Sequence, residues 1–302
     1  MTNKTLRLGT RGSRLALWQS NWVKQKLEGC GATVELVTIK TEGDLVAGPL
    51  FQIGGQGLFT KAIQQALLDN KIDFAVHSLK DLPTEQIPGL TIAAVPERED
   101  SRDCLVCHGD LEWDSLPDKA KIGTGSIRRR AQLLHLRSDL RMEEIRGNVD
   151  TRLEKVASGE FDAIVLAVAG LKRLGWSDKI THIFNANELV PAVGQGALGL
   201  EARADDELIF DWLQKINDAD SFAAVIAERE MLRQLQGGCM APIGAESSVE
   251  SKSLSLRGVV LSTDGVNKIE ASETGDSSDP KAVGQLVAKK LKQLGAAKFI
   301  DD

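Results

Sequence analysis

The chain has 302 residues, of which 42% are hydrophobic and 26% are charged, and its formal net charge is −6. This composition is typical of a globular protein and excludes a disordered one, while the length favours more than one domain. The acidic balance argues against a nucleic-acid partner, and no apolar run reaches the roughly 20 residues that span a bilayer. The N-terminal segment lacks the apolar stretch of an export signal, so we expect a cytoplasmic protein without a membrane partner.

The first two thirds of the sequence contain a repeated pattern. Residues 6–27 and residues 121–136 each predict a strand, a turn that begins Gly-Thr, and a helix; Leu15, Trp18 and Trp22 are expected on one face of the first helix. Residues 71–83 and 160–175 also correspond, since each has an Asp before a buried strand and a Leu-Lys pair after it. Two matches in the same order predict related α/β domains at residues 1–96 and 97–194, each with a mostly parallel sheet.

The remaining sequence has a different character. We expect the first domain to be completed by about residues 195–215, and a small α+β domain to occupy residues 216–302. In that last domain, residues 218–236 predict a helix, residues 253–262 and 267–273 predict antiparallel strands, and residues 280–294 predict a final helix. The fold class is therefore α/β with three domains, of which two resemble the lobes of periplasmic binding proteins and form a cleft. Residues 41–57, rich in glycine and without clear periodicity, are expected to be a mobile loop over this cleft.

Arginine and hydroxyl side chains gather at turns and helix starts in both halves. A planar guanidinium donates two parallel hydrogen bonds to a carboxylate, and helix starts supply further N–H donors. These turns therefore predict a ligand with several carboxylates, whereas the alternative is a set of capped helices with solvated arginines. Arg130 is assigned to this second class. The candidate side chains are Arg11, Ser13, Thr124, Ser126, Arg128, Arg129, Arg146, Arg152 and Arg173.

Three titratable residues, His77, Lys80 and Asp81, lie at the end of a predicted buried strand. In open α/β sheets, ligands bind outside the carboxyl ends of the strands, which makes Asp81 a candidate acid–base group. The alternative is that Asp81 only caps the next turn.

The chain has four cysteines, too few and too scattered for a disulfide framework. Cys104 and Cys107 belong to the sequence CLVCH, which fits the pattern of c-type haem attachment. We expect instead a strand with Cys104 and Val106 on one face and Leu105 and Cys107 on the other, because no export signal is present and a zinc site lacks a second ligand pair. Cys239 follows two glycines in a predicted loop. This setting is equally compatible with a thiol packed inside the protein and with a reactive thiol.

Nine motifs in order, between residues 6 and 244, resemble those of the hydroxymethylbilane synthases, also called porphobilinogen deaminases. They are LGTRGSRLALWQ, GLFTKAIQQALL, AVHSLKDLP, PERED, IGTGSIRRRAQL, RGNVDTRL, DAIVLAVAGLKRLG, PAVGQGALGLE and GGCMAPIG. Single motifs of this kind are weak evidence, but nine in the same order are highly specific.

The resemblance implies a transferase of tetrapyrrole biosynthesis, which makes haem and chlorophyll precursors. Such an enzyme joins four porphobilinogen molecules head to tail with release of ammonia, on a dipyrromethane primer bound covalently to each chain, and hydrolysis then frees linear hydroxymethylbilane. The implied anchor is a thioether to Cys239, and the implied catalytic carboxylate is Asp81, which stabilises the azafulvenium cation and transfers protons. The implied partners are porphobilinogen and the growing oligopyrrole. The resemblance implies no metal, a monomer, and transfer of the product to uroporphyrinogen-III synthase.

The resemblance also assigns the remaining site residues. The implied cofactor contacts are Cys239, Lys80, Asp81, Thr124, Ser126, Arg128, Arg129, Arg146 and Gly147. The implied substrate contacts are Arg11, Ser13, Arg146, Arg152 and Arg173.

The sequence departs from the family pattern at four positions. Gln52, Gln56 and Glu42 stand where basic residues are common, and Gly125 stands where serine is common. We therefore expect weaker capture of substrate by the loop at residues 41–57.

Two alternatives to this synthase function remain. One is a non-catalytic, two-lobed binding protein for a small carboxylate. The other is an enzyme with Cys239 as the nucleophile and His77 as its base.

Overall fold

The computed structural model describes residues 5–40, 60–237 and 241–300. The chain forms two compact units: residues 1–98 together with 197–222, and residues 99–196 together with 223–302. Within the described ranges, no helix has the length and apolar character needed to cross a membrane.

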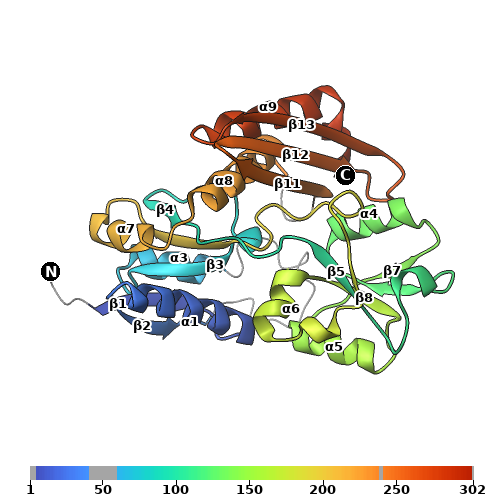
Figure 1. Cartoon of the computed structure of the whole chain (residues 1–302), viewed down its shortest axis with the longest axis horizontal. Helices are drawn as coiled ribbons and strands as arrows, with labels where there is room; N and C mark the ends of the chain where they lie inside the picture. The colour runs from blue at the N-terminus through green and yellow to red at the C-terminus, as the bar shows by residue number, and fades with distance from the viewer. Residues whose placement is uncertain (1–4, 41–59, 238–240, 301–302) are drawn as a thin grey trace. The chain divides into compact units, whose positions relative to one another are not determined.

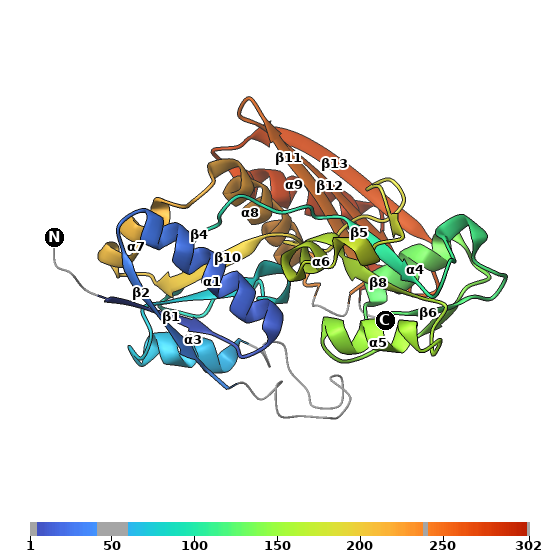
Figure 2. The same ribbon diagram turned by 60° about the horizontal axis from the view of Figure 1, so that its bottom comes forward.

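The first unit contains a five-stranded sheet in the order β2-β1-β3-β10-β4. Its strands are β1 (Thr5–Thr10), β2 (Thr33–Thr38), β3 (Phe74–Ser78), β4 (Leu90–Ala94) and β10 (Leu198–Arg203). Its helices are α1 (Arg14–Gly29), α3 (Lys61–Leu68) and α7 (Glu207–Gln214), with a 3-10 turn η1 (Leu79–Asp81) after β3. Strand β1 is parallel to β2 and β3, whereas β10 is antiparallel to β3 and β4. Figure 2 shows α1 and α3 on opposite sides of this sheet.

The helix predicted within residues 6–27 is present as α1, and Trp22 of the predicted apolar face packs partly buried against the core of this unit. The residues buried against the sheet are Gln19, Ser20, Val23 and Leu27, whereas Trp18 is 37% exposed. Gln19 can be buried because its amide donates a hydrogen bond to Ser78 Oγ.

The second unit begins with a sheet of the same design, in the order β7-β6-β8-β5-β9. Its strands are β5 (Asp103–Cys107), β6 (Lys121–Gly123), β7 (Arg141–Glu143), β8 (Ala163–Ala167) and β9 (His182–Ile183). The helices are α4 (Ile127–Leu136), α5 (Val149–Ala157) and α6 (Val168–Leu174), with 3-10 turns η2 (Trp113–Ser115) and η3 (Ser177–Lys179). Strand β6 is parallel to β7 and β8, and β5 is antiparallel to β8 and β9.

The matching strand orders agree with the two-fold repeat in the sequence. The expectation of mostly parallel sheets is confirmed for strand direction, because four of the five strands in each sheet run the same way, although two of the four described pairings are antiparallel. Both antiparallel pairings belong to the fourth strand of each sheet, β10 or β5, which runs opposite to the other four strands.

Strand β5 confirms the prediction for the CLVCH sequence. Leu105 and Cys107 pack into one buried cluster, and Cys104 and Val106 pack into another. Burial raises the pKa of Cys104 to about 12. Both thiols are therefore packing groups on opposite faces of a strand.

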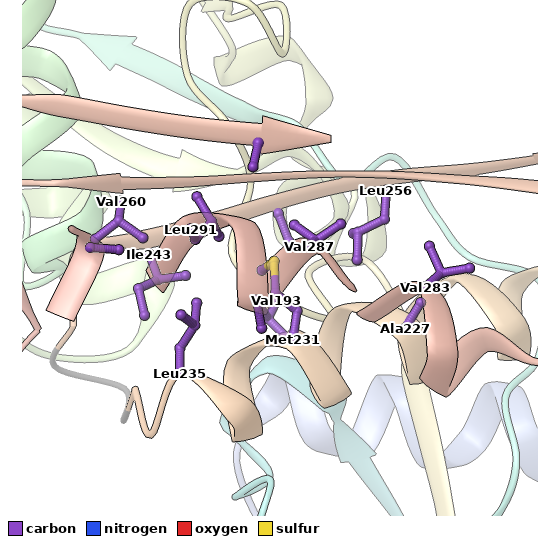
Figure 3. Close-up of a cluster of buried hydrophobic side chains, with 14 of the residues drawn as sticks. Val193, Ala227, Met231, Leu235, Ile243, Leu256, Val260, Val283, Val287 and Leu291 are labelled. Carbon is purple, nitrogen blue, oxygen red and sulfur yellow. The ribbon is translucent and has the colours of Figure 1, made fainter. Parts of the chain in front are cut away.

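The second unit also contains a three-stranded antiparallel sheet, in the order β11-β12-β13. Its strands are β11 (Ile243–Glu250), β12 (Ser253–Leu261) and β13 (Lys268–Asp276), and its helices are α8 (Ala219–Gln234) and α9 (Pro280–Gln293), with a 3-10 turn η4 (Ala296–Phe299). Met231 of α8 packs with Val287 and Leu291 of α9 and with Leu256 of β12 (Figure 3). The antiparallel sheet confirms the predicted fold class, although the sequence did not predict β11.

Candidate active site

The candidate catalytic turn follows the buried strand β3. One 3-10 turn, Leu79–Asp81, is closed by a 3.3 Å hydrogen bond from the Leu82 N–H to the Leu79 carbonyl oxygen. Leu79 is buried, Lys80 is half-buried and Asp81 is exposed. The packed leucine thus holds the turn on the sheet while the carboxylate of Asp81 reaches solvent.

Arg11 and Ser13 lie at the corresponding end of β1. Ser13 is the N-cap of α1, and its Oγ accepts a 3.4 Å hydrogen bond from the Ala16 N–H. Arg11 is half-buried in the connection between β1 and α1. Because β1 and β3 are parallel neighbours, their carboxyl ends bring this pair and the Lys80–Asp81 pair to the same edge of the sheet.

In the second unit, the turn between β6 and α4 is built by its own hydroxyl groups. The Thr124 Oγ1 accepts a 3.1 Å hydrogen bond from the Ser126 N–H, and the Ser126 Oγ accepts a 3.4 Å bond from the Arg129 N–H as the N-cap of α4. Both hydroxyls keep an O–H that can donate to an anion at this helix start.

Arg128 and Arg129 are buried and form ion pairs with one buried carboxylate, Asp103. Arg128 Nη1 lies 2.8 Å from Asp103 Oδ2, and Arg129 Nη2 lies 2.7 Å from Asp103 Oδ1. Burial alone would raise the pKa of Asp103, but the two guanidinium charges outweigh it and hold this pKa at about 2. The alternative of solvated arginines is therefore wrong for these two residues, whereas Arg130 is exposed as expected.

The two guanidinium groups differ in how many of their N–H groups have hydrogen-bond partners. Arg129 also donates to the Val165 carbonyl oxygen at 2.8 Å and to Gln195 Oε1 at 3.4 Å. Arg128 donates to the Val190 carbonyl oxygen at 2.6 Å, while its Nε is buried without a hydrogen-bond partner among the described residues. A buried unpaired donor is costly, so Arg128 is suited to bind an anion.

A second basic turn connects β7 to α5. Arg146 Nε donates to Glu144 Oε1 at 2.9 Å, and Arg152 Nε donates to the Gly147 carbonyl oxygen at 2.8 Å. Gly147 has a φ of +107°, and a Cβ atom there would lie 2.9 Å from the Cβ of Thr151. The turn therefore requires glycine, and Arg152 fixes its backbone.

Arg173 lies near the end of α6, the helix that follows β8. Its Nη2 donates to the Gly196 carbonyl oxygen at 2.6 Å. Burial lowers the pKa of Arg173 to about 10, and the nearby charge of Glu99 partly opposes this shift. Strands β7, β6 and β8 are parallel neighbours, so the turns that follow them start from one edge of this sheet.

The predicted anchor, Cys239, lies outside the described residues, as do Gln52, Gln56 and Glu42. Three buried partners of the candidate residues were not predicted. Asp103 pairs with Arg128 and Arg129, Gln195 accepts from Arg129, and Glu201 contacts His77. The available signal for Asp103 was an Asp as the first residue of a buried strand. Among the described residues, no group of acidic, histidine or cysteine side chains is arranged to hold a metal ion.

Comparison with known families decides the classification. Residues 6–211 match the model described as "Porphobilinogen deaminase, dipyromethane cofactor binding domain", and residues 222–293 match "Porphobilinogen deaminase, C-terminal domain". The chain belongs to the porphobilinogen deaminase family. Membership confirms the predicted transferase class and the predicted dipyrromethane cofactor, which the description of the first model names.

Curated relatives match over nearly the whole chain. The porphobilinogen deaminase of Geobacter sulfurreducens is 48% identical over 96% of this chain and 92% of its own length. That of Acidithiobacillus ferrooxidans is 46% identical over 99% of this chain and 98% of its own length.

Similar solved structures include a putative methionine-binding lipoprotein of Bacillus subtilis, with a TM-score of 0.45 and 12% identity over 72% of this chain and 91% of its own. Another is a YaeC-family lipoprotein of Enterococcus faecalis, with a TM-score of 0.42 and 13% identity over 71% of this chain and 92% of its own.

Proposed function

We propose that this chain acts as a hydroxymethylbilane synthase in which Asp81 is the catalytic carboxylate. The reaction is the stepwise condensation of four porphobilinogen molecules with release of ammonia, followed by hydrolytic release of the linear product. The observation that carries the proposed role of Asp81 is its place in the structure: an exposed carboxylate on a turn that a buried leucine fixes to the end of β3.

Asp81 acts on the incoming porphobilinogen. The carboxylate accepts a hydrogen bond from the pyrrole N–H and stabilises the cation that remains when the C–N bond of the aminomethyl group breaks. The departing amine needs a proton to leave as ammonia, and a proton must be removed after carbon–carbon bond formation. A carboxylate on a rigid turn can carry out both transfers.

The described residues fit a cofactor that bears carboxylate groups. The buried unpaired Nε of Arg128 and the hydroxyls of Thr124 and Ser126 are donors at a helix start. Arg129 pairs with the same carboxylate, Asp103, as Arg128. We therefore assign Arg129 two roles: it helps to hold Arg128 in place, and it supplies a positive charge near the ligand. The bound dipyrromethane supplies the primer on which the chain grows. The proposed cofactor contacts are Cys239 as the thioether anchor, Lys80, Asp81, Thr124, Ser126, Arg128, Arg129, Arg146 and Gly147.

Substrate carboxylates are assigned to the remaining arginine turns. Each added ring carries further carboxylates, so the negative charge of the growing chain increases with each step. Guanidinium groups neutralise that charge and bind each carboxylate through two parallel hydrogen bonds. The proposed contacts are Arg11, Ser13, Arg146, Arg152 and Arg173.

Further assignments follow from the same function. We propose a monomeric, cytoplasmic enzyme with three domains that passes its product to uroporphyrinogen-III synthase. The alternative of a thiol enzyme finds no support in His77, because its Nε2 is bound to Glu201 inside the protein at 2.9 Å. Both matching family models describe porphobilinogen deaminase domains, which supports the synthase over the alternative of a non-catalytic carboxylate-binding protein.

The test is the replacement Asp81→Asn, which keeps the size of the side chain and removes its charge. We expect ammonia release from porphobilinogen to fall by about 10²- to 10⁴-fold while the intact mass still includes the attached cofactor. Asp69→Asn, which also neutralises an exposed carboxylate in the first unit, is the matched control and should keep full activity. Turnover by Asp81→Asn at the control rate would remove Asp81 from the mechanism.

A further inference from the structure

A buried polar group lies behind the strand that carries the catalytic turn. His77 Nε2 is 2.9 Å from Glu201 Oε2, and Gln64 Nε2 donates to Glu201 Oε1 at 2.9 Å. Each of these three residues is only 5% exposed. One carboxylate of β10 thus binds both β3 and α3.

The strand register explains how these side chains meet. Phe74 and Val76 of β3 pack on the face covered by α1, whereas Ala75 packs on the face covered by α3. Since side chains alternate along a strand, His77 shares the face of Ala75. Glu201 pairs with Ala75 in the register, which places its side chain diagonally beside His77.

The residues that follow His77 are bound from the other directions. Ser78 Oγ accepts a 2.8 Å hydrogen bond from Gln19 Nε2 of α1, and the Leu79 N–H donates to the Ala197 carbonyl oxygen at 3.1 Å. A Cβ atom at Gly199 would collide with the side chain of Leu79, so the absence of one allows Leu79 to lie against β10. The end of β3 is therefore held on both faces and along its edge, directly before Lys80 and Asp81.

A buried carboxylate is an expensive way to join a strand and a helix. Removing such a charge from water costs several kcal/mol, and a well-packed apolar group of similar volume often serves stability equally well. Unlike an apolar group, the carboxylate fixes the orientation of its neighbours, because each of its oxygens accepts a hydrogen bond from one donor. The geometry at β10 therefore suits precise placement better than simple packing.

We propose that Glu201 is a positioning residue for the reaction. It holds His77 on β3 and Gln64 on α3, and thereby fixes the end of β3 from which Asp81 projects. Asp81 touches the substrate, whereas Glu201 acts only through the placement of the turn. The inference rests on the proposed role of Asp81.

The experiment compares Glu201→Gln with a matched buried carboxylate, Asp73→Asn. Asp73 directly precedes β3 at the opposite end and is fully buried, and its Oδ2 accepts a 2.8 Å hydrogen bond from the Arg7 N–H. We expect Glu201→Gln to lower kcat by about tenfold to hundredfold, with KM within about twofold and the cofactor still attached. Asp73→Asn should lower the melting temperature and leave kcat of the cofactor-loaded enzyme unchanged.

Variants at His77 test the same contact from the other partner. His77→Gln keeps an N–H that can donate to Glu201 and should retain most of kcat, whereas His77→Leu should show the loss seen in Glu201→Gln. Equal kcat in His77→Leu, His77→Gln and the unaltered enzyme would overturn the proposal, including the case in which Glu201→Gln does not fold. A lower melting temperature with unchanged kcat in Glu201→Gln would also overturn it.

A double variant separates this inference from the proposed function. If Glu201 acts through Asp81, Glu201→Gln should cause no further loss of kcat in the Asp81→Asn background. A full additional loss would refute the positioning role while leaving Asp81 as the catalytic residue. Wild-type turnover by Asp81→Asn alone would refute the proposed function instead.

Discussion

Asp103 is the residue whose replacement should most sharply test the construction of the basic turn at α4. It is fully buried on β5 and lies within 2.8 Å of nitrogen atoms of both Arg128 and Arg129. Asp103→Asn keeps the shape of the side chain and one acceptor oxygen but removes the negative charge. Two buried guanidinium groups would then face each other without a counter-charge.

The expected loss of stability can be estimated in two ways. Breaking a buried ion pair by removing one partner costs about 3–5 kcal/mol. Separately, the fall in the pKa of Asp103 from 3.8 to about 2 corresponds to about 2.5 kcal/mol of stabilisation of the charged form. We therefore expect Asp103→Asn to lower the free energy of unfolding by about 3 kcal/mol at pH 7, a large share of the roughly 5–15 kcal/mol typical of folded proteins.

The same carboxylate gives a pH dependence with a defined direction. The folded pKa of Asp103 lies below its unfolded value, so its contribution is fully present above about pH 4 and is lost as the pH falls through about 2. The stability difference between the unaltered protein and Asp103→Asn should narrow across this acid range.

Urea denaturation followed by far-UV circular dichroism, at pH 7 and at several acid pH values, measures both effects. Glu160→Gln is the matched control, because Glu160 pairs with Lys155 at 3.2 Å on the surface of the same unit and should contribute less than about 1 kcal/mol. The reasoning is refuted if Asp103→Asn loses no more stability than Glu160→Gln, or if the difference stays constant from pH 7 to pH 2.

Three further predictions concern the backbone, a thiol and ligand binding. Gly196→Ala should lower stability by about 1–3 kcal/mol, since φ is +85° there and a Cβ would strike the Glu99 carbonyl oxygen; an unchanged melting temperature would contradict this. Cys104, with its pKa raised to about 12 by burial, should resist alkylation at pH 8 in the native protein and react after unfolding in urea, as measured by peptide mass spectrometry. Arg146→Ala should stall elongation at a particular ring count in intact-mass spectra, whereas Arg141→Ala, which removes an exposed arginine of β7, should show the normal distribution of intermediates.

The elements that the sequence predicted well are those whose periodicity is local. The strand at residues 103–107 places its cysteines on alternate faces as expected, because the alternation belongs to the strand itself. Two features depended on distant partners and were missed. The buried face of α1 includes Gln19, whose amide binds Ser78, and β11 pairs with β12 through residues that show no simple alternation.

The candidate site shows the same division. Asp81 and Ser126 could be placed at strand ends and helix starts because their neighbours in the sequence define those positions. That Arg128 and Arg129 share one buried carboxylate could not be predicted, since Asp103 precedes them by more than twenty residues. The burial of these arginines and their ion pairs depend on the tertiary structure, which a local sequence pattern does not specify.

The strand order of the two α/β sheets has a consequence for synthesis on the ribosome. In the first unit, β4 forms the edge of its sheet and its partner there is β10, which begins at residue 198. The five-stranded sheet of the second unit takes all of its strands from residues 103–183. The part of the chain that emerges first therefore cannot complete its sheet until the later sheet has been made, so the order of closure during translation runs against the order of the sequence.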